Sequence, residues 1–508
     1  MSVLKKLASQ TVLYGFTYFA GRLLNFFLTP FYTRIFAPAA YGAVTEIYAY
    51  IAFFNVLYTY GMETGYFYFA NKHDNEDEVA GTTFLSLLFS SIGLSGLIIL
   101  FSSQIAAWLG YPDRQEYVIY TALILAFDTL TVIPFAYLRK HDKAARFAIL
   151  KFANIAFNIA FNLFFLVLCP ALLARPSYSW LHPFIDAVYR PGFGVGYVFL
   201  SNVLASLLTL ILLLPEIRKI KFRWHKTLWT NIFKYSWPLL ILGFAGMVNE
   251  TLDRILLKRL LLQPPKNLNL QQAMNELGIY SAAYKLSIFM TLAIQSFRYA
   301  AEPFFFSQMK EEGGKAIYAQ ILKYFSFITS LIFLFVMLYI PLFSRLLGPA
   351  FRTDEGMQVV PILLLANLFA GTFIYLSQWY KQTGKTLYGA MISVGGALIT
   401  LVVNIIFIPY YGFLASAWAT FACYFCMALA SYILGQKFYP VAYNTGRIVW
   451  YIASATLLFL ISKFIQESIF DGWHISVYMI NTLFLLLYII QFLYLEKPVF
   501  LLNRIRRK

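Results

Sequence analysis

Charged residues are scarce in this sequence. Asp, Glu, Lys and Arg make up 12% of its 508 residues, whereas soluble domains carry about 25%. Hydrophobic residues make up 60%, and they stand in long blocks. The low charge excludes a soluble globular protein. The long blocks exclude an outer-membrane barrel, whose strands alternate in segments of about ten residues. The composition therefore predicts a helical integral membrane protein.

Cysteine is also rare, and three cysteines are too few for a disulfide framework. Cys423 and Cys426 have CxxC spacing, but they lie in an apolar helix without a nearby His or further Cys, so we expect packing rather than redox or metal chemistry. The histidines are scattered near expected loops, and the nucleotide-binding pattern GxxxxGK[ST] does not occur. We expect no cofactor, no metal site and no use of ATP by this chain.

Long apolar segments are what the sequence does contain. Fourteen of them are near or above the ~20 residues that cross a bilayer as a helix. The seventh contains Pro238, Gly243 and Gly246, which predict a kink or a break. The expected spans are residues 11–35, 43–69, 82–108, 117–138, 146–170, 194–214, 232–262, 279–306, 323–347, 358–380, 388–408, 411–436, 447–465 and 475–495.

Basic residues outnumber acidic ones by 40 to 23, which gives a formal net charge of +17. In a soluble protein this excess would indicate a nucleic-acid partner. Here it lies mostly in short loops between spans, where it predicts membrane topology instead. With both termini in the cytoplasm, the loop EIRKIKFRWHK (216–226) and the tail NRIRRK fall on the inside. The same loop is suited to contact with anionic lipid.

The chain repeats a set of residues in the same order and at similar spacing. This repetition predicts two six-helix halves, 1–222 and 223–440, in the same orientation and related by a pseudo-two-fold axis along the membrane normal. Residues 441–508 then add two helices and a basic cytoplasmic tail. The matched pairs are Arg22 and Arg254, Gly42 and Gly278, Tyr48 and Tyr284, Glu63 and Glu302, Lys72 and Lys310, Arg139 and Lys381, Lys143 and Lys385, and Asn162 and Asn404.

Ionisable residues inside the expected spans are the candidate functional residues, because a charge at the bilayer centre costs about 2.5–3.5 kcal/mol on insertion scales. Glu250 and Arg254 are four residues apart on one helix face and can pair. Asp253 points away from them, and we expect its partner to come from the other half. The full set is Arg22, Glu63, Asp128, Lys151, Glu250, Asp253, Arg254, Lys285, Arg298 and Glu302.

Two interpretations of this set remain open. In the first, the charges form interhelical salt bridges that only hold the fold together. In the second, they line a wet cavity between the halves, where four cations on three helices, Arg22, Arg254, Lys285 and Arg298, would bind an anionic headgroup. Glu63, Asp128, Glu250, Asp253 and Glu302 are then candidates for gating or ion coupling.

Four stretches carry a resemblance to a known family: residues 21–42, 235–257, 277–305 and 403–420. The first places Arg22 in the first span and Tyr41-Gly42 at the start of the second, and the second has Pro238 early and Asp253-Arg254 late. In this order the chain resembles the polysaccharide flippases of the MOP exporter superfamily, which include the O-antigen flippases of Wzx type. The resemblance implies an all-α polytopic fold with two six-helix bundles in a V, two additional helices and alternating access.

The resemblance also implies a function. The cargo would be a polyprenyl-pyrophosphate-linked glycan, moved from the cytoplasmic to the periplasmic leaflet of a bacterial inner membrane for surface polysaccharide synthesis. A polysaccharide polymerase or ligase of the same pathway would be a partner. The alternatives are a lipid II flippase and a MATE-like antiporter, although Arg22, Lys285 and Arg298 would repel organic cations. A membrane enzyme is a third class, but the longest outer loop, 171–193, is short for a catalytic domain, and we expect no catalytic residues.

Overall fold

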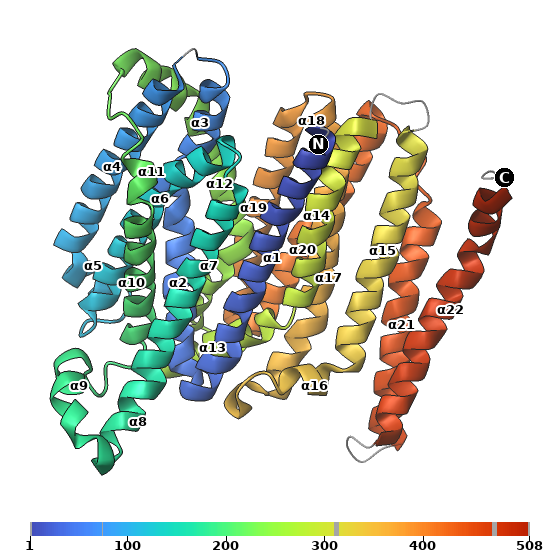
Figure 1. The fold of residues 1–508 in the computed structure, drawn as a ribbon. Helices are drawn as coiled ribbons and strands as arrows, with labels where there is room; N and C mark the ends of the chain where they lie inside the picture. Colours follow the sequence, from blue (N-terminus) through green and yellow to red (C-terminus); the bar gives the residue numbers. More distant parts are fainter. Residues whose placement is uncertain (1–2, 74, 309–313, 470–474, 506–508) are drawn as a thin grey trace. The chain divides into compact units, whose positions relative to one another are not determined.

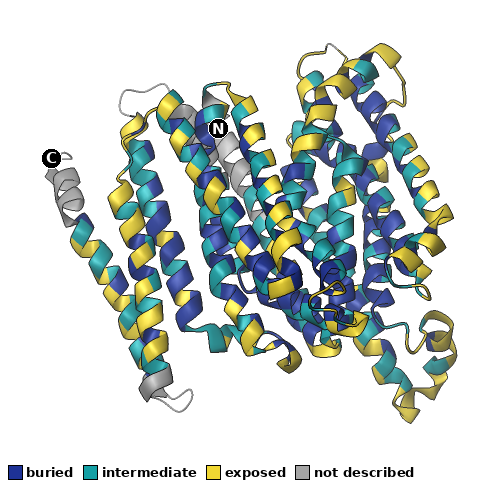
Figure 2. Cartoon of the chain, turned by 180° about the vertical axis from the view of Figure 1, so that it is seen from behind, coloured by how far each residue is buried: buried dark blue, intermediate teal, exposed yellow. Residues whose placement is uncertain are grey.

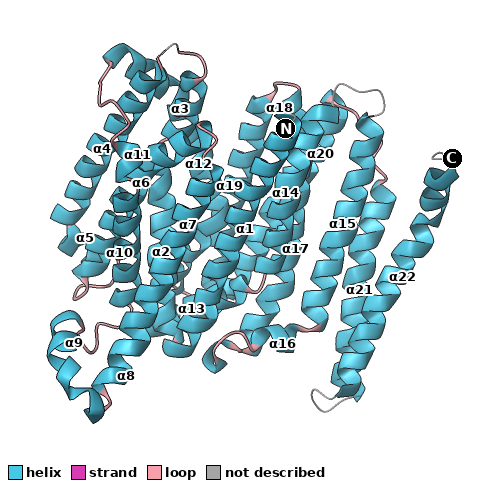
Figure 3. Ribbon diagram, viewed as in Figure 1, coloured by secondary structure: helices cyan, strands magenta, loops and turns pink. Residues whose placement is uncertain are grey.

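The computed structural model is helical throughout the part of the chain that it describes, which is residues 3–73, 75–308, 314–469 and 475–505. Figure 3 shows helices joined by turns and loops, with no strand among these residues. The prediction of an all-α architecture is confirmed. The reason lies in the long apolar blocks, because a helix satisfies every backbone hydrogen bond within its own segment when no water is available.

Packing divides the chain into two units, and each is described by itself. Unit 1 consists of residues 1–281 and 400–413, and unit 2 of residues 282–399 and 414–508. The division differs from the predicted boundary between residues 222 and 223, since residues 226–281 pack with unit 1. A packing unit and an internal repeat are different properties, so the two predicted halves and the C-terminal addition stay a prediction.

Unit 1 is a bundle in which α4, α6, α10 and α7 pack in succession, while α12 lies against α2 and α3. The short helical segment from α8 to α9 extends from one end of this bundle (Figure 1). The helices are α1 (Val3–Ile35), α2 (Pro38–Thr59), α3 (Met62–Ala70), α4 (Glu76–Leu100), α5 (Ser102–Trp108), α6 (Gln115–Lys140), α7 (Ala144–Leu163), η1 (Phe164–Leu168), α8 (Cys169–Leu173), η2 (Pro176–Leu181), α9 (His182–Val188), α10 (Gly196–Leu212), α11 (Leu214–Ile217), α12 (Lys226–Leu261) and α13 (Leu270–Lys285), whose last turn belongs to unit 2.

Unit 2 is built around α15, which contacts α14, α17, α21 and α22. A buried ion pair joins Lys323 on α15 to Glu496 on α22 at 2.5 Å, and the Tyr451 hydroxyl on α21 donates to the same carboxylate at 2.9 Å. The helices are α14 (Ile288–Gln308), α15 (Gly314–Leu338), α16 (Ile340–Ser344), η3 (Pro349–Phe351), α17 (Asp354–Leu376), α18 (Gln378–Gln382), α19 (Thr386–Tyr411), whose residues from Thr400 belong to unit 1, α20 (Phe413–Phe438), α21 (Thr445–Ile469) and α22 (Ile475–Ile505).

Every expected span coincides with one helix or with two or three successive helices. Among the described residues, ten helical segments are long and apolar enough to cross a membrane, and the bent pair α13–α14 makes an eleventh. The other three expected spans correspond to α1, to α10, which has 17 residues, and to α12, which carries several charges. The protein is therefore multi-pass, and the number fourteen stays a prediction.

The outer faces of the helices are apolar. In Figure 2 exposed residues form stripes along individual helices. Large hydrophobic side chains occupy them, such as Phe89 and Ile92 on α4, Phe464 on α21 and Met479 on α22, all more than 60% exposed. A soluble protein does not expose such surface on most of its helices, so these faces are the ones that contact lipid.

The seventh expected span is a single uninterrupted helix. α12 runs from Lys226 to Leu261 with Pro238 inside it, so of the two predicted outcomes the break is wrong and the kink stays a prediction. Gly243 permits close packing here, because a Cβ at this position would lie 2.7 Å from Val56 Cγ1 of α2. The break lies instead in the eighth span, at residues 286–287 between α13 and α14. Pro238 is tolerated inside α12 because neighbouring groups can satisfy the backbone carbonyl that loses its hydrogen bond to the missing proline N–H.

Two of the matched repeat pairs have the same local structure. Lys143 immediately precedes α7, and Lys385 immediately precedes α19. Asn162 and Asn404 are both completely buried, and each donates its amide to the backbone carbonyl four residues earlier, at 2.8 and 2.7 Å. These local similarities are what an internal repeat requires.

Candidate functional site

Arg22 lies in the middle of α1 and is exposed. The adjacent Gly21 is buried, and a Cβ there would lie 3.1 Å from Ile155 on α7. Because successive residues of a helix point about 100° apart, this contact leaves Arg22 facing away from α7. Among the described residues, the structure gives the Arg22 guanidinium no ion-pair or hydrogen-bond partner. Its positive charge therefore stands in the middle of a span, and no carboxylate among the described residues is paired with it.

The three predicted charges on α12 separate into two groups. Glu250 is exposed and Arg254 is half-buried, and the Arg254 Nη1 donates to the backbone carbonyl of Glu250 at 3.4 Å. Asp253 is only 4% exposed and accepts a 2.5 Å hydrogen bond from the Tyr280 hydroxyl on α13. Tyr280 lies in the same predicted half as Asp253, so the expectation of a partner from the other half is wrong. The hydroxyl is close because α13 follows α12 directly.

A buried network that the sequence analysis missed lies one turn further along α12. The Lys258 ammonium is bound to both carboxylate oxygens of Glu46 on α2, at 2.9 and 3.1 Å. It also donates to the carbonyl of Leu109 at 2.5 Å, while the Tyr111 hydroxyl donates to Glu46 at 2.5 Å. The two charged side chains are 5% and 1% exposed. Both lie near the ends of their expected spans, where a long charged side chain can often reach the membrane surface.

Two glycines allow α2 to approach α13 near this network. A Cβ on Gly42 would clash with the carbonyl oxygen of Met274 and would lie 3.3 Å from the backbone nitrogen of Gly278. A Cβ on Gly278 would in turn clash with the backbone of Pro38. Gly42 and Gly278 are a matched repeat pair, so equivalent positions of the two predicted halves contact each other here. Their correspondence follows from the sequence alone, whereas their contact appears only in the structure.

A second group of charges lies at the other end of α6. Arg139 forms an ion pair with Glu63 at 2.8 Å, and its guanidinium lies 4.7 Å from the centre of the Phe67 ring. Lys151 on α7 interacts electrostatically with Glu63, Asp128 and Arg139, and its ammonium lies 4.0 Å from the centre of the Phe135 ring. The charges of Glu63 and Asp128, which the sequence proposes for gating or coupling, therefore act on the same lysine, while the ion pair of Glu63 is with Arg139.

The remaining predicted residues belong to unit 2. Lys285 is exposed at the end of α13, and Arg298 is half-buried on α14. Glu302 falls in α14, but its side chain lies outside the described residues. The structure thus pairs Arg254 with the Glu250 backbone and Asp253 with Tyr280, and it places Lys151 where the charges of Glu63 and Asp128 both act on it. A common cavity for the four cations stays a prediction.

Two further expectations from the sequence are the packing role of Cys423 and Cys426 and the absence of a metal site. Cys423 is buried and its sulfur lies 3.6 Å from that of Met427, whereas Cys426 is exposed. In the part of the chain that the structure describes, no group of three or more His, Cys, Asp or Glu side chains has the arrangement of a metal site.

Comparison with solved structures shows the fold. A lipid II flippase, MurJ, in an inward closed conformation, is similar over 95% of this chain and 99% of its own, with a TM-score of 0.66 and 14% identity. A multidrug resistance MATE family transporter of the MOP superfamily, in an inward-facing conformation, is similar over 82% of this chain and 94% of its own, with a TM-score of 0.64 and 12% identity. The fold is therefore of the MurJ and MATE type.

Comparison of sequences shows the family. Protein 1 of the Lsg locus of Haemophilus influenzae is 22% identical over 428 residues, which cover 81% of this chain and 95% of that protein. The family model described as polysaccharide biosynthesis protein matches residues 7–309, more than half of the chain. With this match and the helical membrane fold, the chain belongs to the polysaccharide biosynthesis protein family.

Proposed function

We propose that this protein is a flippase that moves a polyprenyl-pyrophosphate-linked oligosaccharide from the cytoplasmic to the periplasmic leaflet of the bacterial inner membrane by alternating access. The family and the fold of MurJ and MATE type support a transporter that serves polysaccharide synthesis. The apolar outer faces of the helices support a position in the bilayer.

The observation that carries the proposal is Arg22. A guanidinium in the middle of a span, exposed and without an ion-pair partner among the described residues, requires an anion or water beside it. A pyrophosphate supplies that anion, and Arg binds phosphate oxygens with two parallel hydrogen bonds. Arg254 on α12, Lys285 on α13 and Arg298 on α14 are the other cations that the sequence analysis predicts for cargo binding. The lipid tail stays in the bilayer while the headgroup crosses.

The contact of α2 with α12 and α13 is the basis for a proposed gate at one end of the transport path. The Glu46–Lys258 pair and the two glycine contacts join helices of the two predicted halves. We propose that this contact is the closed periplasmic gate, which opens when the headgroup is released. The sidedness follows from the basic loop at the other end, which the positive-inside rule assigns to the cytoplasm together with both termini.

The test is a leaflet-exchange assay in liposomes that contain a polyprenyl-pyrophosphate oligosaccharide with a fluorescent sugar. An added quencher reports the labelled sugars that reach the outer leaflet. We expect the protein to accelerate exchange over empty liposomes, and lipid II in a parallel arm to exchange more slowly. Faster exchange of lipid II would make this protein a lipid II flippase. If the protein exchanges neither lipid but exports an organic cation under an ion gradient, it is an antiporter.

The energy source is tested in the same assay. Glu63 and Asp128 share Lys151, so protonation of either carboxylate would redistribute charge around that lysine. We propose this group as the ion-coupling site. An imposed proton or sodium gradient should then raise the exchange rate, whereas removal of product by a polymerase or ligase would drive transport without one.

A further inference from the structure

The segment that leads into α12 presents an unusual surface. In residues 218–226, RKIKFRWHK, every residue is exposed except Ile220, which is 3% exposed. Lysine and arginine occupy more than half of the positions. Two large aromatic side chains stand among them, Phe222 at 55% and Trp224 at 44% exposure. Exposed cations and aromatic rings alternate in a short stretch of chain.

The backbone of this segment is fixed to the first turns of α4. Lys221 forms an ion pair with Asp77 at 2.6 Å, and the Thr82 hydroxyl donates to the carbonyl of Arg223 at 3.2 Å. Gly81 leaves room for the segment, because a Cβ there would lie 3.0 Å from the Arg223 nitrogen. The surface is therefore already ordered, so a ligand need not supply the free energy for ordering it.

The acidic residues beside the segment already have basic partners. Glu76 lies 3.4 Å from Lys140, Asp77 is held by Lys221, and Glu78 lies 3.7 Å from the His225 ring. The structure gives Arg218, Lys219 and Arg223 no ion pair with a described carboxylate. The segment therefore keeps a net positive charge at its exposed surface.

The aromatic rings place the segment at the edge of the bilayer. Phe222 stacks on Phe84 with ring centres 5.4 Å apart, and Trp224 contacts Phe89 edge-on at 6.5 Å. Phe89 begins an exposed apolar face that continues along α4 through Ile92 to Leu100. The cations thus stand at the end of a lipid-facing helix, at the depth where tryptophan and basic side chains meet headgroups.

A pocket of about 280 Å³ adjoins the segment at the N-terminus of α12. Lys226, Asn231, His73 and His225 contribute polar groups to its lining, and Glu78 is the acidic one. The unpaired backbone N–H groups of a long helix point to this end and favour a phosphate. The pocket gives the exposed cations a place in which a headgroup can sit.

We propose that segment 218–226 and this pocket bind the phosphate headgroup of an anionic glycerophospholipid of the surrounding leaflet. The alternation of fixed cations with lipid-facing rings carries the assignment, because a soluble anion would need the charges but not the rings. The proposal does not depend on which cargo the protein moves. Each Lys or Arg near an anionic bilayer surface contributes about a fivefold preference.

Trp224 is the reporter for the test. The protein is reconstituted into bilayers that contain a brominated lipid, either phosphatidylglycerol or phosphatidylcholine. The quenching of Trp224 fluorescence by the lipid is obtained as the difference between wild type and Trp224→Phe. We expect phosphatidylglycerol to quench Trp224 several-fold more than phosphatidylcholine. In the triple variant Arg218→Gln/Lys219→Gln/Arg223→Gln the two lipids should quench equally. This variant keeps Lys221, and thus the anchor to Asp77.

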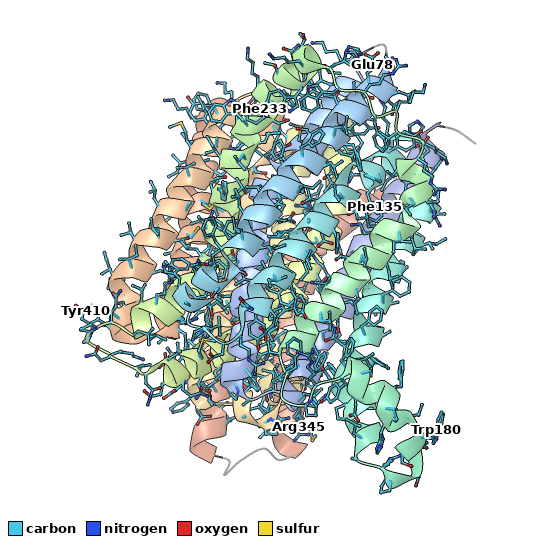
Figure 4. All side chains as sticks on the ribbon, turned by 90° about the vertical axis from the view of Figure 1, so that its left-hand side faces the viewer. Glu78, Phe135, Trp180, Phe233, Arg345 and Tyr410 are labelled. Carbon is cyan, nitrogen blue, oxygen red and sulfur yellow. The ribbon has the colours of Figure 1, made fainter. Side chains whose placement is uncertain are left out.

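Trp180 supplies the matched control. It is 73% exposed between Arg175 and Arg190 in sequence, and Figure 4 shows it at the opposite end of the bundle from Glu78. The quenching of Trp180 fluorescence, obtained as the difference between wild type and Trp180→Phe, should be the same with the two lipids. Equal quenching of Trp224 by both lipids would overturn the proposal, as would a preference that survives in the triple variant. Loss of the preference with millimolar inorganic phosphate would show a site for free anions instead.

Discussion

Glu46 and Lys258 form a buried ion pair that joins α2 to α12, although they are 212 residues apart in the sequence. The Leu109 carbonyl and the Tyr111 hydroxyl complete the hydrogen bonding of this pair. Removing one partner of a buried ion pair costs about 3–5 kcal/mol, because the other charge is left uncompensated, whereas replacing both with apolar residues can be close to neutral. The pair therefore allows a decisive experiment.

Glu46→Leu and Lys258→Met should each lower the thermal stability of the purified protein by an amount consistent with a loss of about 3–5 kcal/mol. The double variant Glu46→Leu/Lys258→Met should recover most of this loss. A double-mutant cycle from thermal unfolding in detergent measures the coupling. Additive effects of the two single variants would show that the pair does not stabilise the contact.

Gly42→Ala and Gly278→Ala should destabilise the contact of α2 with α13, because the added methyl group meets backbone atoms that cannot move aside cheaply. Overpacking of this kind costs about 1–3 kcal/mol. Gly93→Ala and Gly96→Ala on α4 are matched controls, since a Cβ at these positions meets nothing within 4 Å. The controls should gain up to about 1 kcal/mol from helix propensity. Equal effects at all four positions would contradict the close approach.

Arg22→Gln should reduce the initial rate of leaflet exchange about tenfold or more while leaving thermal stability within about 0.5 kcal/mol, because Arg22 is exposed and holds no described carboxylate. Arg175→Gln, which removes an exposed arginine of the α8–η2 connection, should leave the exchange rate unchanged. A large loss of stability with Arg22→Gln would mean that the residue supports the fold rather than binding the cargo.

Asp128→Asn should abolish the stimulation of exchange by an ion gradient if the Asp128–Lys151–Glu63 group couples transport to ions. Exchange without a gradient should persist, since the four proposed cargo-binding cations are unchanged. The comparison is made in liposomes with a proton or a sodium gradient of either sign. Glu355→Gln, an exposed first-turn residue of α17, is the control. Stimulation that survives in Asp128→Asn would place the coupling site elsewhere.

Glu496→Gln should loosen the attachment of α22 to α15, because the Lys323 ammonium, whose side chain is 12% exposed, would lose its counter-charge. The cost should be several kcal/mol, with faster hydrogen exchange confined to α15, α21 and α22. Tyr451→Phe removes one hydrogen bond to the same carboxylate and should cost only about 1 kcal/mol. Unchanged exchange in these helices would show that apolar packing alone holds them together.

The sequence by itself determined the class of the protein and the positions of its helices. Apolar blocks of this length have one stable form in a bilayer, which is the helix, so each expected span coincides with helices in the structure. The same reasoning identified Arg22 and Asp253 as costly charges, because the cost of a charge before any pairing is set by its depth in the bilayer, which the sequence indicates. It also found the correspondence of Gly42 with Gly278.

Only the tertiary structure decided which charges meet. Lys258 and Glu46 stand near span ends, where a charged side chain can reach the surface, yet packing of α12 on α2 buries both. Asp253 accepts a hydrogen bond from Tyr280, and Glu63 forms its ion pair with Arg139, through helix rotations that no sequence spacing determines. The hydrophobic effect that selects spans is non-directional. The partner of a charged side chain depends on directional contacts between helices, and these exist only once the chain has packed.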